Sequence, residues 1–138
     1  MEPPANKLDI AIGHVVLAVR DVEESARFYS KLGLHPCQTS AELAILELRG
    51  GTHLLLMRRK VGAKGRTAAP KSATQTIDLM ISGRTRDELE ACRDAAIGVG
   101  LDPTPIPPRS LFGHYIFHLR DPDGNDVAVA TSHSTLNQ

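Results

Sequence analysis

The sequence predicts an α+β fold in which two tandem βαβββ modules form a cupped mixed sheet. First, an apolar, strand-like run followed by an amphipathic helix occurs twice, at residues 14–36 and 76–103. Second, both copies end alike, in Gly-Leu-His-Pro at 33–36 and Gly-Leu-Asp-Pro at 100–103. Third, short strand-like segments joined by glycine-containing turns follow each helix. Repetition of one pattern within a chain indicates a duplicated structural unit.

The two copies divide the chain into a first module at residues 8–58 and a second at 74–132, within one compact structural domain. A chain of 138 residues is long enough to bury a core of its own. The basic segment 59–73 between the modules contains glycine and proline, and we predict that it is a solvated linker. The alternative is a loop that captures an anion.

In the first module, Val15–Val19 is an apolar run typical of a buried strand. Asp21 is placed as the N-cap of the following helix, with Glu24 at the spacing of a capping box, and Gly33 is placed to end that helix. Two strands are expected next, in Glu-Leu-Ala-Ile-Leu-Glu-Leu and Thr-His-Leu-Leu-Leu-Met-Arg, joined by Arg-Gly-Gly at 49–51.

The second module repeats this order. A strand at 76–81 precedes a helix whose capping box is predicted at Thr85 and Glu88. Two strands in His-Tyr-Ile-Phe-His-Leu-Arg and Asn-Asp-Val-Ala-Val-Ala follow, joined by Asp-Pro-Asp-Gly at 121–124. The proline-rich segment 103–110 can form at most an edge strand, because proline has no N–H to donate to a neighbouring strand.

Composition excludes several classes of partner. Sixteen basic residues balance sixteen acidic ones, so the net charge gives no reason to expect nucleic acid or a membrane surface. Aromatic residues make up 4% of the chain, which argues against a stacking platform for bases. The N-terminal residues lack the apolar segment of a signal peptide, so we expect a cytoplasmic protein. Cys37 and Cys92 show no metal or catalytic motif and are predicted to be small buried residues.

The motifs at 13–34 (GHVVLAVRDVEESARFYSKLGL) and 117–125 (FHLRDPDGN) resemble the vicinal oxygen chelate superfamily, which comprises glyoxalases, bleomycin resistance proteins and extradiol dioxygenases. The resemblance covers nearly the whole chain. It implies a cup that binds a small molecule, a homodimer, and metal ligands at matching points on the first and last strands of each module. One fold of this kind hosts several reactions and also non-enzymatic binders.

His14 matches the first metal position that the resemblance implies. The other three positions fall at Leu54, Thr76 and Ala128. Because aliphatic side chains cannot bind a metal and a lone threonine hydroxyl is a poor ligand, we predict that the usual site is broken and expect no cofactor. The alternative is a shift of one residue that turns His53 into the cup, so that a divalent metal ion binds His14 with His53.

Side chains alternate between the two faces of a strand, which selects further cup-facing residues. Asp78 and His118 are the candidate catalytic residues, as metal-free acid and base. Arg109 is placed to recognise a carboxylate or phosphate. Alternatively, Asp78 binds a backbone amide or Arg109, and the histidines are satisfied within a core. The predicted ligand-binding residues are His14, Val16, Leu54, Thr76, Met80, Arg109, Ile116 and Ala128.

Three functions are compatible with these residues. The first is a protein that binds a small organic molecule in the cup without the family's usual metal site. The second is a lyase, isomerase or dioxygenase-type enzyme, with a divalent metal at His14 or with Asp78 and His118 as acid and base. The third is an interaction module whose cup edges serve dimerisation.

Overall fold

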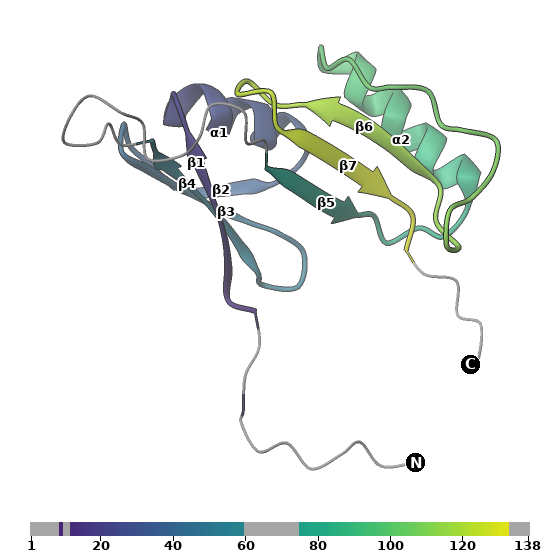
Figure 1. The fold of residues 1–138 in the computed structure, drawn as a ribbon, viewed down its shortest axis with the longest axis horizontal. Coiled ribbons are helices and arrows are strands. Elements are labelled where there is room, and N and C mark those ends of the chain that lie inside the picture. The colour runs from purple at the N-terminus through teal and green to yellow at the C-terminus, as the bar shows by residue number, and fades with distance from the viewer. Residues whose placement is uncertain (1–8, 10–11, 60–74, 133–138) are drawn as a thin grey trace.

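The computed structural model describes residues 9, 12–59 and 75–132 (Figure 1). Residues 60–73 of the predicted basic linker lie outside the described residues. The elements in chain order are β1 (His14–Val19), α1 (Val22–Lys31), β2 (His35–Thr39), β3 (Leu43–Glu47), β4 (His53–Arg58), β5 (Thr76–Met80), α2 (Arg86–Gly98), β6 (Ile116–Arg120) and β7 (Asp126–Ala130). They form one four-stranded and one three-stranded sheet, which confirms the predicted α+β fold class.

The first sheet has the strand order β1-β4-β3-β2. β1 runs parallel to β4, and the other neighbours are antiparallel. Leu17 and Val19 of β1 and Leu56 of β4 are buried in the core together with Val22 and Tyr29 of α1. Alternate residues of each strand therefore face the helix, and the residues between them face the opposite side.

The second sheet has the order β5-β7-β6, one strand fewer than the predicted module. β5 runs parallel to β7, and β6 is antiparallel to it. The proline-rich segment takes the place of a further strand beside β6. It makes a single backbone hydrogen bond there, from Thr104 N to the His118 carbonyl at 2.9 Å. Its prolines have no N–H for a continuous ladder.

Both helices begin as predicted. The Asp21 side chain accepts a hydrogen bond from the Glu24 N–H, and Thr85 and Glu88 form a reciprocal capping box. Gly33 and Gly100 follow the helices with φ angles of 104° and 90°. A left-handed residue at this position costs glycine little and ends the helix.

Polar contacts fix the two modules against each other. The Tyr29 hydroxyl on α1 donates to Asp121 Oδ2 at 2.7 Å, and the Arg20 N–H donates to Asp123 Oδ1 at 2.9 Å. The Gln75 side-chain amide donates to the Ala18 carbonyl of β1 at 3.3 Å. The Asp-Pro-Asp-Gly turn of the second module is therefore also a contact with the first.

The core lies between each sheet and its helix. Val15 at the start of β1 is exposed although it shares the face of Leu17 and Val19. The faces away from the helices carry further exposed large hydrophobic side chains, namely Val16 of β1, Met57 of β4 and Met80 of β5. We call these two faces the open faces. Among the described residues, no helix is long and apolar enough to cross a membrane.

Candidate functional site

The open face of the first sheet is apolar in the middle and polar at one end. The strand register places Val16 beside Leu55, and Leu55 beside Ile45. At the end of the sheet, His14 lies beside His53, and His53 beside Glu47. The rings of His14 and His53 stack with centroids 5.7 Å apart.

Leu54 is not on this face, so its predicted place in the cup is wrong. The register pairs Leu54 with Val15, and Leu54 is buried in the helix-facing core at 2% exposure. The alternative, in which His53 faces the cup together with His14, is what the structure shows. The reason is that β4 begins at His53, one residue out of step with the predicted alignment, and a shift of one residue exchanges the faces of a strand.

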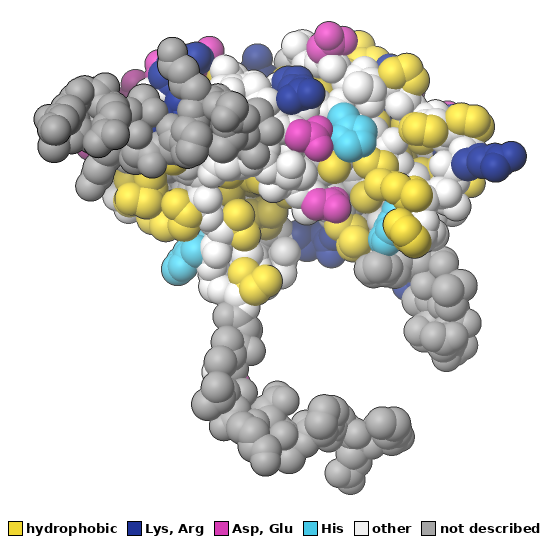
Figure 2. All heavy atoms as spheres, viewed as in Figure 1, with side chains coloured by type: hydrophobic (Ala, Val, Ile, Leu, Met, Phe, Trp, Pro, Cys, Tyr) yellow, Lys and Arg dark blue, Asp and Glu magenta, His cyan; other side chains and the backbone are white. Residues whose placement is uncertain are grey.

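The open face of the second sheet carries Thr76, Asp78 and Met80 from β5, all exposed, whereas Ile77 between them is buried. This alternation confirms the predicted orientation of the strand. Across the sheet, Asp78 pairs with Ala128, and Ala128 pairs with His118. Figure 2 shows acidic and histidine side chains together over β5, β7 and β6, and hydrophobic side chains over the first sheet.

Asp78 and His118 share a face but are separated by the central strand. Two strand spacings amount to about 9.6 Å between their Cα atoms. The carboxylate that contacts His118 belongs to Asp126, with Nδ1 and Oδ1 3.0 Å apart. Asp78 is exposed to solvent rather than enclosed in an apolar cavity with the histidines, which corrects the predicted constellation. Asp126 precedes Ala128 by two residues, so the same alternation could have identified it.

A cleft of about 420 Å³ lies between the first sheet and β5. Among its lining residues are Val15, Leu54, Thr76, Asp78 and Met80. Three predicted ligand-binding residues, Leu54, Thr76 and Met80, therefore line the same cleft. Leu54 reaches it from the helix-facing side of the first sheet.

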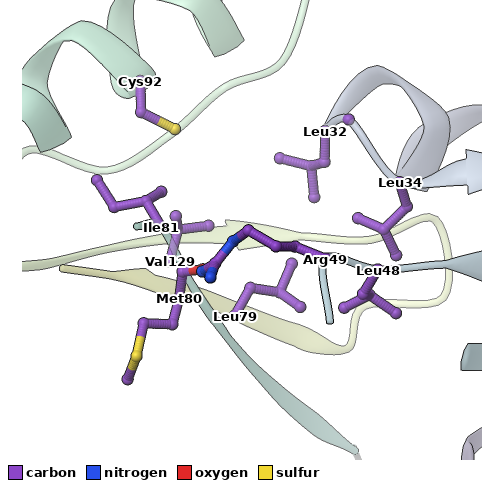
Figure 3. Close-up of a pocket in the computed structure, with 10 residues that line it drawn as sticks. Leu32, Leu34, Leu48, Arg49, Leu79, Met80, Ile81, Cys92 and Val129 are labelled. Atoms are coloured by element: carbon purple, nitrogen blue, oxygen red, sulfur yellow. The ribbon is translucent and has the colours of Figure 1, made fainter. Parts of the chain in front are cut away.

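A smaller cleft of about 200 Å³ adjoins it, between the end of α1 and α2 (Figure 3). Arg49 and Met80 line both clefts. The Arg49 guanidinium donates to the Met80 carbonyl at 2.9 Å. This contact holds the turn between β3 and β4 against the end of β5.

The remaining predicted site residues are spread over the molecule. Val16 is 50% exposed on the open face, and Ala128 is 6% exposed between Asp78 and His118. Ile116 is half-buried at the start of β6. Arg109 is exposed in the loop before β6 and is not among the lining residues of the two clefts. Its role in binding an anion stays a prediction.

A model of the Glyoxalase/Bleomycin resistance protein/Dioxygenase superfamily matches residues 11–129. The chain belongs to this superfamily. A search of curated proteins gives no significant match.

Solved structures with the same fold span nearly the whole chain. Lactoylglutathione lyase from Agrobacterium tumefaciens is 21% identical with a TM-score of 0.70, over 91% of this chain and 96% of that one. A glyoxalase/bleomycin resistance protein/dioxygenase from Nocardioides is 17% identical with a TM-score of 0.70, over 94% and 88%. The oxidase ChaP-H2 is 19% identical with a TM-score of 0.66, over 93% and 98%. At these identities, the similarity shows a shared fold only.

The metal positions implied by the superfamily can now be located by internal symmetry. His14 pairs with His53 in the first module, and Thr76 pairs with Asp126 in the second. His53 and Asp126 are therefore equivalent positions in the two modules. Leu55 follows His53 by two residues and Ala128 follows Asp126 by two, so Leu55 is the counterpart of Ala128. The four positions therefore hold His14, Leu55, Thr76 and Ala128. With one imidazole, one hydroxyl and two aliphatic side chains, this donor set does not fit a divalent metal ion.

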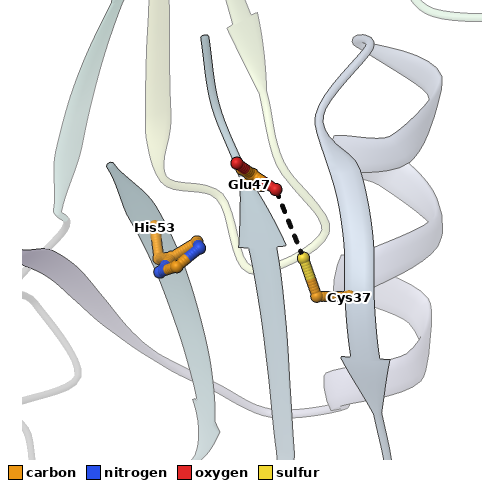
Figure 4. Close-up of side chains that lie close together, drawn as sticks. All are labelled: Cys37, Glu47 and His53. Atoms are coloured by element: carbon orange, nitrogen blue, oxygen red, sulfur yellow. Dashed lines mark hydrogen bonds between the residues drawn. The ribbon is translucent and has the colours of Figure 1, made fainter. Parts of the chain in front are cut away.

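One cluster of metal-type donors was not anticipated from the sequence. Cys37, Glu47 and His53 have ligand atoms that all lie within 4.8 Å of one another (Figure 4). Cys37 is exposed, so the prediction that it is buried is wrong. Cys92 is partly buried on α2, and burial raises the pKa of its thiol.

Proposed function

We propose that the protein binds a small organic molecule against the open faces of its sheets, without the usual metal site of the superfamily. The observation that carries this proposal is the exposure of Val16, Met57 and Met80, at 50%, 41% and 40%. Apolar side chains grouped on one surface commonly mark a binding site. Most apolar residues on the helix-covered faces of these strands are buried, with Val15 of β1, 42% exposed, as an exception.

The side chains around these residues suggest what the ligand looks like. The middle of the first sheet offers Val16, Leu55 and Ile45, an aliphatic surface for an apolar body. The second sheet offers Asp78 and the pair His118–Asp126, which accept or donate hydrogen bonds. A compact molecule with an aliphatic part and a polar end fits both surfaces better than a large planar one, which favours aromatic partners.

Binding of the fluorescent amphiphile 1-anilinonaphthalene-8-sulfonate to the native protein tests this proposal. We expect saturable binding that weakens about tenfold or more in Val16→Gln and in Met80→Gln, because each change removes apolar contact area. Ile97→Gln is the matched control, since Ile97 is 48% exposed but lies on α2, away from the cup. Equal affinity in all variants, or an equal loss in Ile97→Gln, would contradict binding in the cup.

The contact between His118 and Asp126 favours a second candidate, a metal-free acid–base enzyme. A carboxylate that holds Nδ1 orients the imidazole, so that Nε2 can exchange a proton with a bound molecule. Because one structural neighbour is a lactoylglutathione lyase, lactoylglutathione is a reasonable first substrate to assay. Turnover that is lost in His118→Gln and in Asp126→Asn, but kept in His35→Gln, would favour this enzyme over the binding protein.

A further inference from the structure

Four donor residues form a row at one end of the first sheet, one from each strand. The register places His14, His53 and Glu47 side by side on β1, β4 and β3. Cys37 of β2 extends this row, with its Sγ 3.8 Å from Glu47 Oε1. Figure 4 shows Cys37, Glu47 and His53 lying close together on neighbouring strands. None of these three residues, Cys37, Glu47 and His53, is one of the superfamily's metal positions at 14, 55, 76 and 128, although His14 is adjacent to His53.

The register of β2 against β3 places the thiol on this face. Pro36 pairs with Leu46 and Gln38 pairs with Ile45, so Cys37 is an extra residue between two consecutive pairs. His35 pairs with Glu47, and Cys37 follows His35 by two residues, so Cys37 lies on the same face as Glu47. Its side chain is accessible to solvent.

We propose that Cys37, Glu47 and His53 form a binding site for a thiophilic divalent cation, with Zn²⁺ as the expected ion. Thiolate, imidazole and carboxylate are the three protein ligands that Zn²⁺ prefers. Bonds of about 2.3 Å to sulfur and about 2.0 Å to nitrogen or oxygen set the donor atoms of a tetrahedral site with one sulfur roughly 3.3–3.5 Å apart. The Sγ–Oε1 separation of 3.8 Å is a few tenths of an ångström longer than this. The 4.8 Å limit for the whole cluster leaves an adjustment of about 1.5 Å at most, which side-chain rotation can supply.

His14 is placed to supply a fourth ligand to the cation. Its ring stacks on that of His53 at a centroid distance of 5.7 Å, so it lies next to the three ligands. A fourth ligand from His14 would close the site, and a water molecule in that position would make it reactive. The site is independent of the proposed ligand in the cup, because its three residues are not those that supply the apolar surface.

Cobalt spectroscopy tests this site directly, because Co²⁺ replaces Zn²⁺ and reports on bound thiolate through a sulfur-to-cobalt charge-transfer band in the near ultraviolet. The metal-free protein is titrated with Co²⁺ under reducing conditions, and Zn²⁺ is then added. We expect a band that saturates at one Co²⁺ per chain and that Zn²⁺ abolishes, because a tetrahedral site with thiolate and imidazole ligands favours Zn²⁺. Cys37→Ser should remove the band, and Glu47→Gln and His53→Gln should each weaken Co²⁺ binding at least tenfold.

Cys92→Ser is the matched control, because Cys92 is the other cysteine of the chain and lies on α2. Its band and affinity should equal those of the unmodified protein. Absence of a saturable band, its persistence in Cys37→Ser, or its loss in Cys92→Ser would overturn the proposed site. Since Cys37 and Glu47 are exposed, their substitution leaves the core intact and the variants can be compared as folded proteins.

Discussion

Asp121 is a buried carboxylate that organises both its own turn and the junction between modules. It is 4% exposed and accepts hydrogen bonds from the Tyr29 hydroxyl, from the backbone N–H groups of Asp123 and Asn125, and from the Asn125 side chain. Four donors satisfy the two oxygens, as a buried charge requires. The turn motif therefore serves stability in this chain.

Tyr29, the partner of Asp121, should make the stability of the fold decrease at alkaline pH. Burial, and then the hydrogen bond to Asp121, raise the pKa of the Tyr29 hydroxyl above its usual value. The fold thus keeps Tyr29 protonated, and this contribution is complete below about pH 10, the ordinary tyrosine pKa. Above that pH, the unfolded chain releases the proton first, so the free energy of unfolding should fall by about 1.4 kcal/mol per pH unit from this group.

Urea unfolding of the unmodified protein and of Tyr29→Phe, measured at neutral pH and above pH 10, checks this dependence. At neutral pH, Tyr29→Phe should lose about 1–3 kcal/mol, because Asp121 loses a buried partner. At higher pH, the difference between the two proteins should shrink. Tyr115→Phe, which changes the other tyrosine of the chain, serves as the control. A constant difference across the pH range would contradict the role of Tyr29.

Single residues also show where sequence reasoning about the site succeeds and where it fails. Alternation placed Thr76, Asp78 and Met80 correctly, because β5 is regular from end to end. It failed for Leu54, because the start of β4 is set by the turn before it, and a shift of one residue reverses the face. It did not reveal the cluster at Cys37, since the proximity of Cys37 to Glu47 depends on the register of β2 against β3, which the sequence does not specify.

At the scale of elements, the segments with the strongest local determinants were predicted best. Both helices begin at their predicted caps because the hydrogen bond from an N-cap side chain to the first turn is a local interaction that needs no tertiary context. The number of strands in the second module depends on whether the proline-rich segment can join the edge of β6, which is a tertiary question. In the structure, this segment makes one backbone hydrogen bond to β6 and does not form a strand.

Two glycines near the ends of α2 should respond in opposite ways to alanine. A Cβ atom at Gly83 would lie 2.8 Å from Glu88 Cβ and 2.7 Å from its Cδ, so Gly83→Ala displaces the side chain that closes the capping box. A Cβ atom at Gly98 meets nothing within 4 Å, and Gly98 lies in the last turn of the helix. There, alanine should raise the free energy of unfolding by about 0.5–1 kcal/mol, because it restricts the unfolded chain.

Thermal unfolding followed by circular dichroism measures both effects. We expect a lower Tm for Gly83→Ala and a higher one for Gly98→Ala. Thr85→Ser, which keeps the hydroxyl that accepts from the Glu88 N–H, should leave the Tm nearly unchanged. If both alanine variants moved the Tm in the same direction, the clash at the capping box would not be the cause.

At the scale of the whole molecule, the duplicated modules have diverged in the surface that each presents. The open face of the first sheet is aliphatic with a row of donors at one end, and that of the second is acidic and contains the His118–Asp126 pair. The repeat was predictable because each copy retains its helix, its caps and its terminal Gly-Leu-X-Pro. Which residues face each other across the two sheets depends on register, and register is set by the packing of the entire fold.

These exposed faces also bear on assembly, and we predict a homodimer. Val16 and Met57 are exposed on different strands of the first sheet. A small ligand would cover only part of this face, whereas another protein chain could cover both residues. A second copy of the chain is the partner that the resemblance to the superfamily implies. In a two-fold interface each substituted residue occurs twice, so one charge placed in it acts from both subunits. Met57→Asp should therefore shift the protein toward monomer in sedimentation velocity experiments over a range of concentrations.

Val99→Asp is the matched control for this experiment, because Val99 is 46% exposed, close to the 41% of Met57, but ends α2 on the side away from the open faces. It should sediment as the unmodified protein does. Both variants add one negative charge, so a difference in their sedimentation would come from the position of the charge and not from the charge itself. A monomer at every concentration for the unmodified protein, or dissociation in Val99→Asp alone, would show that the open face of the first sheet remains exposed to solvent and is available to a ligand from a single chain.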